Sequence, residues 1–172
     1  KNGNIITDEK IPEFKKIKEI ASNKNLNLFS LLDKKNNFQF LSHQYEGESQ
    51  LLEIRYKNSI HKIKLNLIGQ VQLKNLLMAV IASIKSDMNI EDIINVIPKI
   101  KSVEGRFERV GIIKNNSKVI LDYAHTPDAL KTCINNIKEQ FPGHKITLLF
   151  GCGGNRDQNK RAKMGKIADL FS

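Results

Sequence analysis

Hydrophobic residues change their spacing within the first 70 residues, and the change predicts two kinds of structure. Residues 3–7 and 26–32 are short apolar runs, and between them residues 11–21 place apolar side chains at helical spacing. This order predicts a βαβ unit with parallel strands. From residue 37 to 67, apolar and polar residues alternate, which predicts half-buried antiparallel strands with a tight turn at residues 57–59.

Two helices and a polar linker follow the alternating segment. Residues 69–84 place their apolar side chains on one wide face, which predicts an amphipathic helix. Residues 90–100 predict a second helix, because two acidic residues fall in its first turn, where the helix dipole favours them. The polar stretch 102–108 contains a glycine at position 105, and we place a domain boundary there.

The last part of the chain opens with a predicted hairpin. Residues 107–114 and 117–122 are expected to form two strands joined across Asn115 and Asn116. The apolar run 119–121 predicts that the second strand is buried.

A helix, a strand and another helix complete the predicted order. Thr126 and Pro127 are typical of an N-cap and a first helical residue, and this helix is expected to run to about Phe141. Residues 145–150 predict a buried parallel strand, and residues 161–171 an amphipathic helix. The βαβα order predicts an α/β protein with a second, Rossmann-like domain that begins at the polar linker.

Composition narrows the possible functions. The 172-residue chain has a net charge of +10, but lysine is spread along it and tryptophan is absent, so we expect no nucleic-acid binding. No apolar run approaches the roughly 20 residues of a membrane span, and the first residues lack the apolar region of a signal peptide. Cys133 and Cys152 have no CxxC spacing, so we expect reduced cysteines in a cytoplasmic protein.

Residues 151–161 form a glycine-rich, charged turn. Three glycines fall within four residues between the predicted strand and helix, and two arginines, a lysine and an aspartate follow. Because ligands bind at the carboxyl ends of strands in open α/β sheets, this turn is a candidate anion site. A glycine-rich turn with solvated charges explains the pattern equally well.

Further candidate binding groups lie in three other segments. Asp122 is suited to accept hydrogen bonds from a ribose diol and His125 to stack on a base, unless Asp122 and Thr126 merely cap the helix. Arg106, in the linker, is suited to hold a phosphate, or is a surface arginine. Asn75, on an otherwise apolar helix, is a base-recognition group or a capping residue.

The sequence contains no recognisable catalytic pair or metal site. The four histidines lack metal-binding spacing, no nucleophile lies beside a base, and the Walker A pattern is absent. The residues by themselves therefore predict a cytosolic α/β protein with a nucleotide or anion site between two domains.

Four stretches resemble, in order and separation, motifs of the Mur ligase family. The resemblance covers essentially the whole chain and is most specific from residue 69 onward. The last two stretches together are most similar to the branch that adds a diamino acid to UDP-N-acetylmuramoyl-L-alanyl-D-glutamate. The stretches are Gly69-Gln-Val-Gln-Leu-Lys-Asn-Leu-Leu77, Gly105-Arg-Phe-Glu-Arg-Val110, Asp122-Tyr-Ala-His-Thr-Pro-Asp-Ala-Leu130 and Gly151-Cys-Gly-Gly-Asn-Arg-Asp157.

The resemblance implies a three-domain enzyme of which this chain is a middle part. Residues 1–104 would be the later part of the central ATP-binding domain, and residues 105–172 the first part of the C-terminal, amino-acid-binding domain. The family's P-loop, magnesium ligands and Asp-Asn-Pro-Arg motif are expected outside the chain. The chain alone is therefore expected to be inactive, with no catalytic residue and no metal ligand of its own.

The implied reaction is ATP-dependent amide formation through an acyl phosphate. It uses ATP and Mg²⁺, and its substrates are a UDP-N-acetylmuramoyl dipeptide and a diamino acid, with meso-diaminopimelate preferred to L-lysine on family grounds. By resemblance, Asn75 lies near the adenine and Arg106 approaches the phosphates. Asp122 binds the ribose, and His125 lies beside the nucleotide. Arg156 contacts the carboxylate of the incoming amino acid, and the enzyme is expected to be a cytoplasmic monomer without membrane insertion.

Three alternatives remain open. A sister Mur ligase or a folylpolyglutamate synthase would share most of these motifs. The Gly-Cys-Gly-Gly-x-Arg-Asp stretch separates them from the leading interpretation, because those enzymes do not normally carry it in this form. The third alternative is a nucleotide-binding module with no catalysis of its own.

Overall fold

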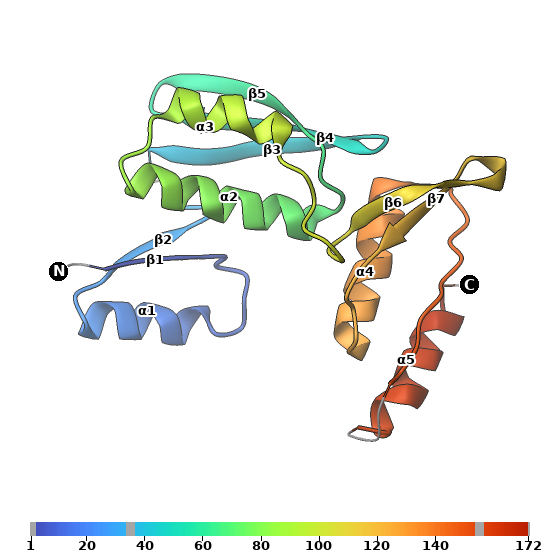
Figure 1. Ribbon diagram of the computed structural model, residues 1–172. Coiled ribbons are helices and arrows are strands. Elements are labelled where there is room, and N and C mark those ends of the chain that lie inside the picture. Colours follow the sequence, from blue (N-terminus) through green and yellow to red (C-terminus); the bar gives the residue numbers. More distant parts are fainter. Residues whose placement is uncertain (1–2, 34–36, 154–156, 172) are drawn as a thin grey trace. The chain divides into compact units, whose positions relative to one another are not determined.

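The structure is a computed structural model that describes residues 3–33, 37–153 and 157–171 (Figure 1). The chain divides into two compact units, residues 1–100 and 101–172. Helices and small sheets are combined in both units, so the prediction of an α/β fold is confirmed.

The first unit begins with the predicted βαβ arrangement. Strands β1 (Asn4–Thr7) and β2 (Asn27–Ser30) pair in parallel, and helix α1 (Phe14–Asn23) connects them. Helix α1 starts three residues later than expected, because Pro12 lies in the turn that precedes it. Figure 1 shows α1 on one side of this strand pair and the long helix of the unit on the other.

A three-stranded antiparallel sheet follows, as the alternating pattern predicts. It consists of β3 (Phe38–Glu46), β4 (Ser49–Tyr56) and β5 (Ser59–Leu65), in that order. The β4–β5 hairpin turns through two residues, and the first of them, Lys57, has a φ of 52°. A positive φ at this position is typical of two-residue hairpin turns.

Two helices complete the first unit. Helix α2 (Gln70–Lys85) matches its prediction closely. Helix α3 (Ile90–Val96) is shorter than predicted and passes into a 3₁₀ turn, η1 (Ile97–Lys99). Pro98 explains the change, because proline has no N–H to donate to the carbonyl four residues earlier.

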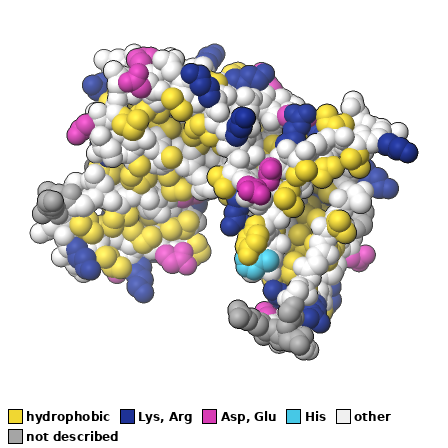
Figure 2. Space-filling model, in the orientation of Figure 1, with side chains coloured by type: hydrophobic (Ala, Val, Ile, Leu, Met, Phe, Trp, Pro, Cys, Tyr) yellow, Lys and Arg dark blue, Asp and Glu magenta, His cyan; other side chains and the backbone are white. Residues whose placement is uncertain are grey.

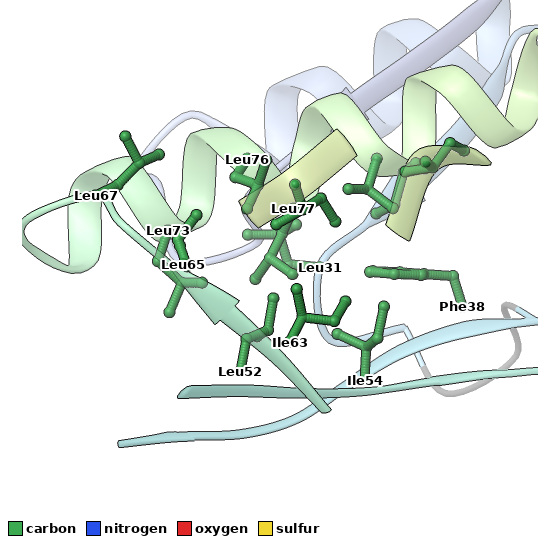
Figure 3. Close-up of a cluster of buried hydrophobic side chains, with 14 residues drawn as sticks. Leu31, Phe38, Leu52, Ile54, Ile63, Leu65, Leu67, Leu73, Leu76 and Leu77 are labelled. Atoms are coloured by element: carbon green, nitrogen blue, oxygen red, sulfur yellow. The ribbon is translucent and has the colours of Figure 1, made fainter. Parts of the chain in front are cut away.

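The core of the first unit lies between the antiparallel sheet and helices α2 and α3 (Figure 3). Alternate residues of β4 and β5 point into it, and they meet the apolar face of α2 that the sequence predicts. The buried residues include Leu52, Ile54, Ile63, Leu65, Leu67, Leu73, Leu76, Leu77, Val80, Ile81, Ile93 and Ile97.

The second unit contains the predicted hairpin and two helices. Strands β6 (Glu108–Ile113) and β7 (Ser117–Leu121) are antiparallel, and the short turn η2 (Lys114–Asn116) joins them. Helices α4 (Pro127–Gln140) and α5 (Asn159–Asp169) follow, the second two residues earlier than expected.

Strand β7 is not buried as predicted. Val119 and Ile120 are half-buried, and Leu121 is 49% exposed. Figure 2 shows hydrophobic side chains gathered along the hairpin, where Val110, Ile112 and Ile113 are also exposed. The prediction was wrong because an apolar run becomes buried only where another layer covers it.

Residues 145–150 do not form the predicted parallel strand. No strand of the described residues pairs with this segment, and Leu149 is 98% exposed. Ile146 and Leu148 instead pack against a small core of Leu130, Ile134 and Met164 that α4 and α5 share. A strand requires a neighbour that completes its main-chain hydrogen bonds, so apolar character alone does not determine one.

Candidate functional site

Hydrogen bonds from main-chain N–H groups stabilise the turn Gly105–Glu108, near the start of the second unit. The Gly105 N–H donates to Glu108 Oε2 at 2.8 Å, and the Arg106 N–H donates to the carbonyl of Val103 at 2.9 Å. Gly105 has a φ of 66°, which favours glycine. Phe107 also has a positive φ of 48°, and its ring is buried, so packing of the ring compensates for an unfavourable backbone conformation.

Asp122, the first residue after β7, connects this turn to the segment that precedes α4. Its Oδ2 accepts a hydrogen bond from the Phe107 N–H at 3.1 Å, and its Oδ1 accepts one from the Ala124 N–H at 3.0 Å. A carboxylate can accept about four hydrogen bonds, so Asp122 retains the capacity to accept from a further donor such as a sugar hydroxyl. The structure thus joins the predicted Asp122 to the turn that carries the predicted Arg106.

Tyr123 contacts two of the predicted nucleotide-binding residues of this unit. The Arg106 guanidinium carbon lies 4.8 Å from the centroid of the Tyr123 ring, within the range of a cation–π contact. The His125 ring lies 5.0 Å from the same ring, and its Nδ1 is 3.0 Å from the carbonyl oxygen of Tyr123. Arg106, Asp122 and His125 therefore form one cluster, which we call the Asp122 cluster.

The capping alternative applies to Thr126 but not to Asp122. Thr126 Oγ1 accepts a hydrogen bond from the Ala129 N–H at 3.2 Å, so Thr126 is the N-cap of α4. Both amides that bond to Asp122 lie outside that helix. The carboxylate therefore organises the surrounding loops rather than the helix end.

Cys133, on α4, lies beside the Asp122 carboxylate. Burial, the negative charge of Asp122 and a hydrogen bond to its carboxylate together raise the pKa of the Cys133 thiol to about 12, and burial has the largest effect. A thiol with this pKa remains protonated at neutral pH and is a poor nucleophile.

We therefore expect Cys133 to resist alkylation in the folded protein. After an hour with iodoacetamide at pH 7.5, peptide mass spectrometry should find Cys133 unmodified, because almost no thiolate is present. The same treatment in concentrated urea is the control and should modify it fully. Modification of the folded protein at the rate of an ordinary exposed cysteine would contradict the assignment.

The fourth predicted nucleotide residue, Asn75, lies in the first unit. It is exposed in the second turn of α2. Its neighbour Lys74 forms an ion pair with Asp8, at the carboxyl end of β1, with 2.7 Å between Nζ and Oδ2. Burial raises the pKa of Asp8, but hydrogen bonds from the Lys74 ammonium and the Lys10 amide outweigh it and hold the pKa below its ordinary value of 3.8. The pair therefore stabilises α2 against β1.

Replacing Lys74 with methionine should lower the free energy of unfolding by about 1–3 kcal/mol at neutral pH, because a mostly buried carboxylate loses its partner. Asp8 has a depressed pKa in the folded state, so its contribution is present above about pH 3.8 and is lost as the pH falls through the folded pKa. Urea unfolding at pH 7 and pH 3 measures both effects.

The exposed pair Lys64–Glu46 provides a matched control for this substitution. Lys64→Met removes the same charge from a solvated ion pair and should cost less than about 0.5 kcal/mol. Equal losses for the two variants, or a Lys74→Met effect that grows as the pH falls, would refute a stabilising role for the Asp8–Lys74 pair.

Comparison with known sequences identifies the protein family of this chain. The family model described as "Mur ligase, glutamate ligase domain" matches residues 105–172, which include the whole Asp122 cluster. A relative from Rickettsia typhi, UDP-N-acetylmuramoyl-L-alanyl-D-glutamate--2,6-diaminopimelate ligase, is 33% identical over 172 residues, or 99% of this chain. The chain belongs to the Mur ligase family.

The chain matches only a part of each Mur ligase relative. It covers 34% of the Rickettsia typhi protein. A protein of the same name from Fusobacterium nucleatum is 41% identical over 121 residues, which are 70% of this chain and 25% of that protein. The chain thus spans about a third or less of the length of these curated relatives.

Solved structures of a diaminopimelate ligase and of a folylpolyglutamate synthetase share the fold. A UDP-N-acetylmuramoyl-L-alanyl-D-glutamate--2,6-diaminopimelate ligase aligns over 99% of this chain and 35% of its own, with a TM-score of 0.63 and 22% identity. A folylpolyglutamate synthetase from Lactobacillus casei aligns over 100% and 42%, with a TM-score of 0.71 and 17% identity. These low identities establish a common fold and nothing more specific.

The glycine-rich turn of this Mur ligase chain is described only in part. Arg156, the predicted contact of the amino-acid substrate, lies outside the described residues. A Cβ built at Gly151 or Gly153 would meet no atom within 4 Å, so packing within the chain does not require glycine at either position. Lys160 and Arg161 lie in the first turn of α5, where they can contribute positive charge.

No metal site is found in the part of the chain that the structure describes. No three side chains among its histidines, cysteines, aspartates and glutamates come close enough together to hold a metal ion. Within the same residues, no helix has the length and apolar character needed to span a bilayer.

Several groups of this site could not be found from the sequence. Tyr123 lies inside a recognised motif, but its contact with Arg106 depends on a turn 17 residues earlier in the chain. The Asp8–Lys74 pair joins residues 66 positions apart. The only sequence signal for either was proximity to a motif: Tyr123 follows Asp122, and Lys74 precedes Asn75.

Proposed function

We propose that this chain is part of UDP-N-acetylmuramyl-tripeptide synthetase (MurE), a cytoplasmic, monomeric enzyme of peptidoglycan synthesis. Residues 1–104 would be the later part of its ATP-binding domain, and residues 105–172 the first part of its amino-acid-binding domain. The reaction would join meso-diaminopimelate to UDP-N-acetylmuramoyl-L-alanyl-D-glutamate at the expense of ATP. Two relatives that carry this activity in their names, one matched along 99% of this chain and the other along 70%, support the proposal.

The main observation behind the proposal is that residues of two family motifs donate hydrogen bonds to the same carboxylate. Asp122 accepts hydrogen bonds from Phe107 of the Gly-Arg-Phe-Glu turn and from Ala124 of its own motif. The arrangement supports a ribose at Asp122 and phosphates near Arg106, since a guanidinium forms strong, charge-assisted hydrogen bonds to phosphate oxygens. The exposed His125, whose ring lies 5.0 Å from that of Tyr123, would lie against the nucleotide.

The proposed chemistry requires positioning rather than a protein nucleophile. The γ-carboxylate of the D-glutamate would take the γ-phosphoryl group of ATP, and the amine of the diamino acid would displace phosphate from the acyl phosphate. Mg²⁺ would neutralise charge on the phosphates, but the described residues do not gather a set of ligands for it. The role of this chain would be to bind and orient the nucleotide through Asn75, Arg106, Asp122 and His125, and the amino acid through Arg156.

Phosphate release by the complete enzyme tests the proposal. ATP and UDP-N-acetylmuramoyl-L-alanyl-D-glutamate would be supplied with either meso-diaminopimelate or L-lysine. Phosphate release that depends on meso-diaminopimelate is expected. Release that depends on L-lysine would support the ligase activity but show that L-lysine is the amino acid added. The 172-residue chain alone should release no phosphate.

A folylpolyglutamate synthase remains the second candidate, because the Lactobacillus casei enzyme has the same fold over the whole chain. The same assay with a reduced folate and L-glutamate distinguishes the two. Phosphate release only in that arm would replace the proposed function. No release in any arm, from a folded protein that binds ATP, would favour a nucleotide-binding module without catalysis.

A further inference from the structure

Gln50, the second residue of β4, has a fully buried side-chain amide. The residue is 0% exposed, and burying an amide costs free energy unless hydrogen bonds replace those to water. Its Nε2 donates to the carbonyl of Leu67 at 2.9 Å and to the carbonyl of Gly69 at 3.2 Å. A side chain of the antiparallel sheet therefore holds the loop that leads into α2.

The loop held by Gln50 determines where α2 begins. Gly69 precedes the helix with a φ of 82° and a ψ of 151°, and it has no side chain with which to cap the helix. Its carbonyl accepts from Gln50 and also, at 3.3 Å, from the Leu73 N–H, in the first turn of α2. One acceptor thus serves both the sheet and the helix, which ties the start of α2 to β4. Figure 3 shows Leu67 and Leu73 lying close to Leu65 of β5 in the same region.

Asn75 lies a short distance along this helix. Six residues separate it from Gly69, which corresponds to about 9 Å of helix at 1.5 Å per residue. On the β1 side, the ion pair of Lys74 with Asp8 holds the same turn. A change in the rotation or start of α2 would therefore move the Asn75 amide directly.

We propose that Gln50 is a positioning residue for the nucleotide site: its buried amide fixes the start of α2 and, through that helix, the Asn75 side chain. This inference rests on the proposed function, in which Asn75 lies near the adenine. Stability alone gives a weak reason for a glutamine here, because its Oε1 is buried and has no hydrogen-bond partner among the described residues. What glutamine provides and leucine does not is the pair of hydrogen bonds to Leu67 and Gly69.

The test uses the complete enzyme and four variants: Gln50→Leu, Asn75→Ala, the double variant and Gln44→Leu. Gln44 is exposed on β3 of the same sheet, so Gln44→Leu makes the same chemical change away from α2. Gln50→Leu should raise the KM for ATP about tenfold, the equivalent of one to two hydrogen bonds, with kcat within about twofold. Gln44→Leu should leave both unchanged.

The double variant distinguishes positioning from general destabilisation. If Gln50 acts through Asn75, the KM for ATP of the double variant should equal that of Asn75→Ala alone, because the second change has nothing left to disturb. Multiplicative effects of the two changes, or an unchanged KM in Gln50→Leu, would overturn the proposal.

Hydrogen exchange separates failure of this inference from failure of the proposed function. The Leu73 amide should exchange about tenfold faster in Gln50→Leu than in the unaltered protein, while the amides of β4 and β5 keep their rates. Unaltered exchange at Leu73 would refute the inference whether or not ATP binds. An unaltered enzyme that does not use ATP would refute the proposed function instead.

Discussion

Replacing Asp122 with alanine is expected to raise the KM for ATP of the complete enzyme about 10- to 100-fold, since a hydrogen bond to a charged group contributes about 1.5–3 kcal/mol. The same change removes the acceptor of the Phe107 and Ala124 amides. We therefore also expect the free energy of unfolding to fall by about 1–3 kcal/mol. Steady-state kinetics and urea unfolding of the purified variant measure the two effects.

Two further variants separate binding by Asp122 from its structural effect. Asp122→Asn keeps the size and one acceptor oxygen, so it should fall between the unaltered enzyme and Asp122→Ala in both measurements. Asp128→Ala, in the exposed first turn of α4, removes an aspartate of the same motif and should leave the KM for ATP unchanged. If Asp122→Ala loses stability but keeps its KM for ATP, the carboxylate organises the loops and does not bind the ribose.

Arg106→Ala is expected to reduce kcat/KM for ATP about 10- to 100-fold, because a charge-assisted contact with the phosphates is lost. Arg106→Lys should recover only part of this, since an ammonium keeps the charge but lacks the planar fork of the guanidinium. Stability should change little in either variant, because the Arg106 side chain is exposed. Initial rates over a range of ATP concentrations provide the measurement.

The control for Arg106 is Arg109→Ala, an exposed arginine on β6 that should leave the kinetics of ATP unchanged. Arg156→Ala gives the opposite comparison, because it should mainly raise the KM for the diamino acid. A reversal, with Arg106 affecting the amino acid and Arg156 affecting ATP, would show that the two roles are assigned wrongly.

Most of the helices and hairpins of this protein follow from local sequence. The cap at Thr126 and Pro127 marks the start of α4, and the apolar face of residues 69–84 matches α2 within one residue at each end. The β4–β5 and β6–β7 hairpins occur at the turns expected for them. These features depend on hydrogen bonds and side-chain spacing within a few residues, which the order of amino acids specifies directly.

The candidate site was predictable as separate residues but not as a structure. The motifs suggested Arg106, Asp122 and His125, yet Tyr123, which contacts two of them, was not recognised as their common support. Gln50 gave no signal, because it is one polar residue in a segment where polar and apolar residues alternate. Contacts between residues distant in sequence depend on the packing of whole elements, which local patterns do not describe.

The sequence by itself determined the order and the ends of most elements, the motifs of the site and the resemblance to the Mur ligases. Only the tertiary structure decided that residues 145–150 are not a paired strand and that the Asp122 carboxylate holds the amide of Phe107. It also decided that a buried glutamine holds the start of α2. The physical reason is the same in each case. The position of a main-chain or side-chain amide depends on its hydrogen-bond partner, and that partner is distant in the sequence.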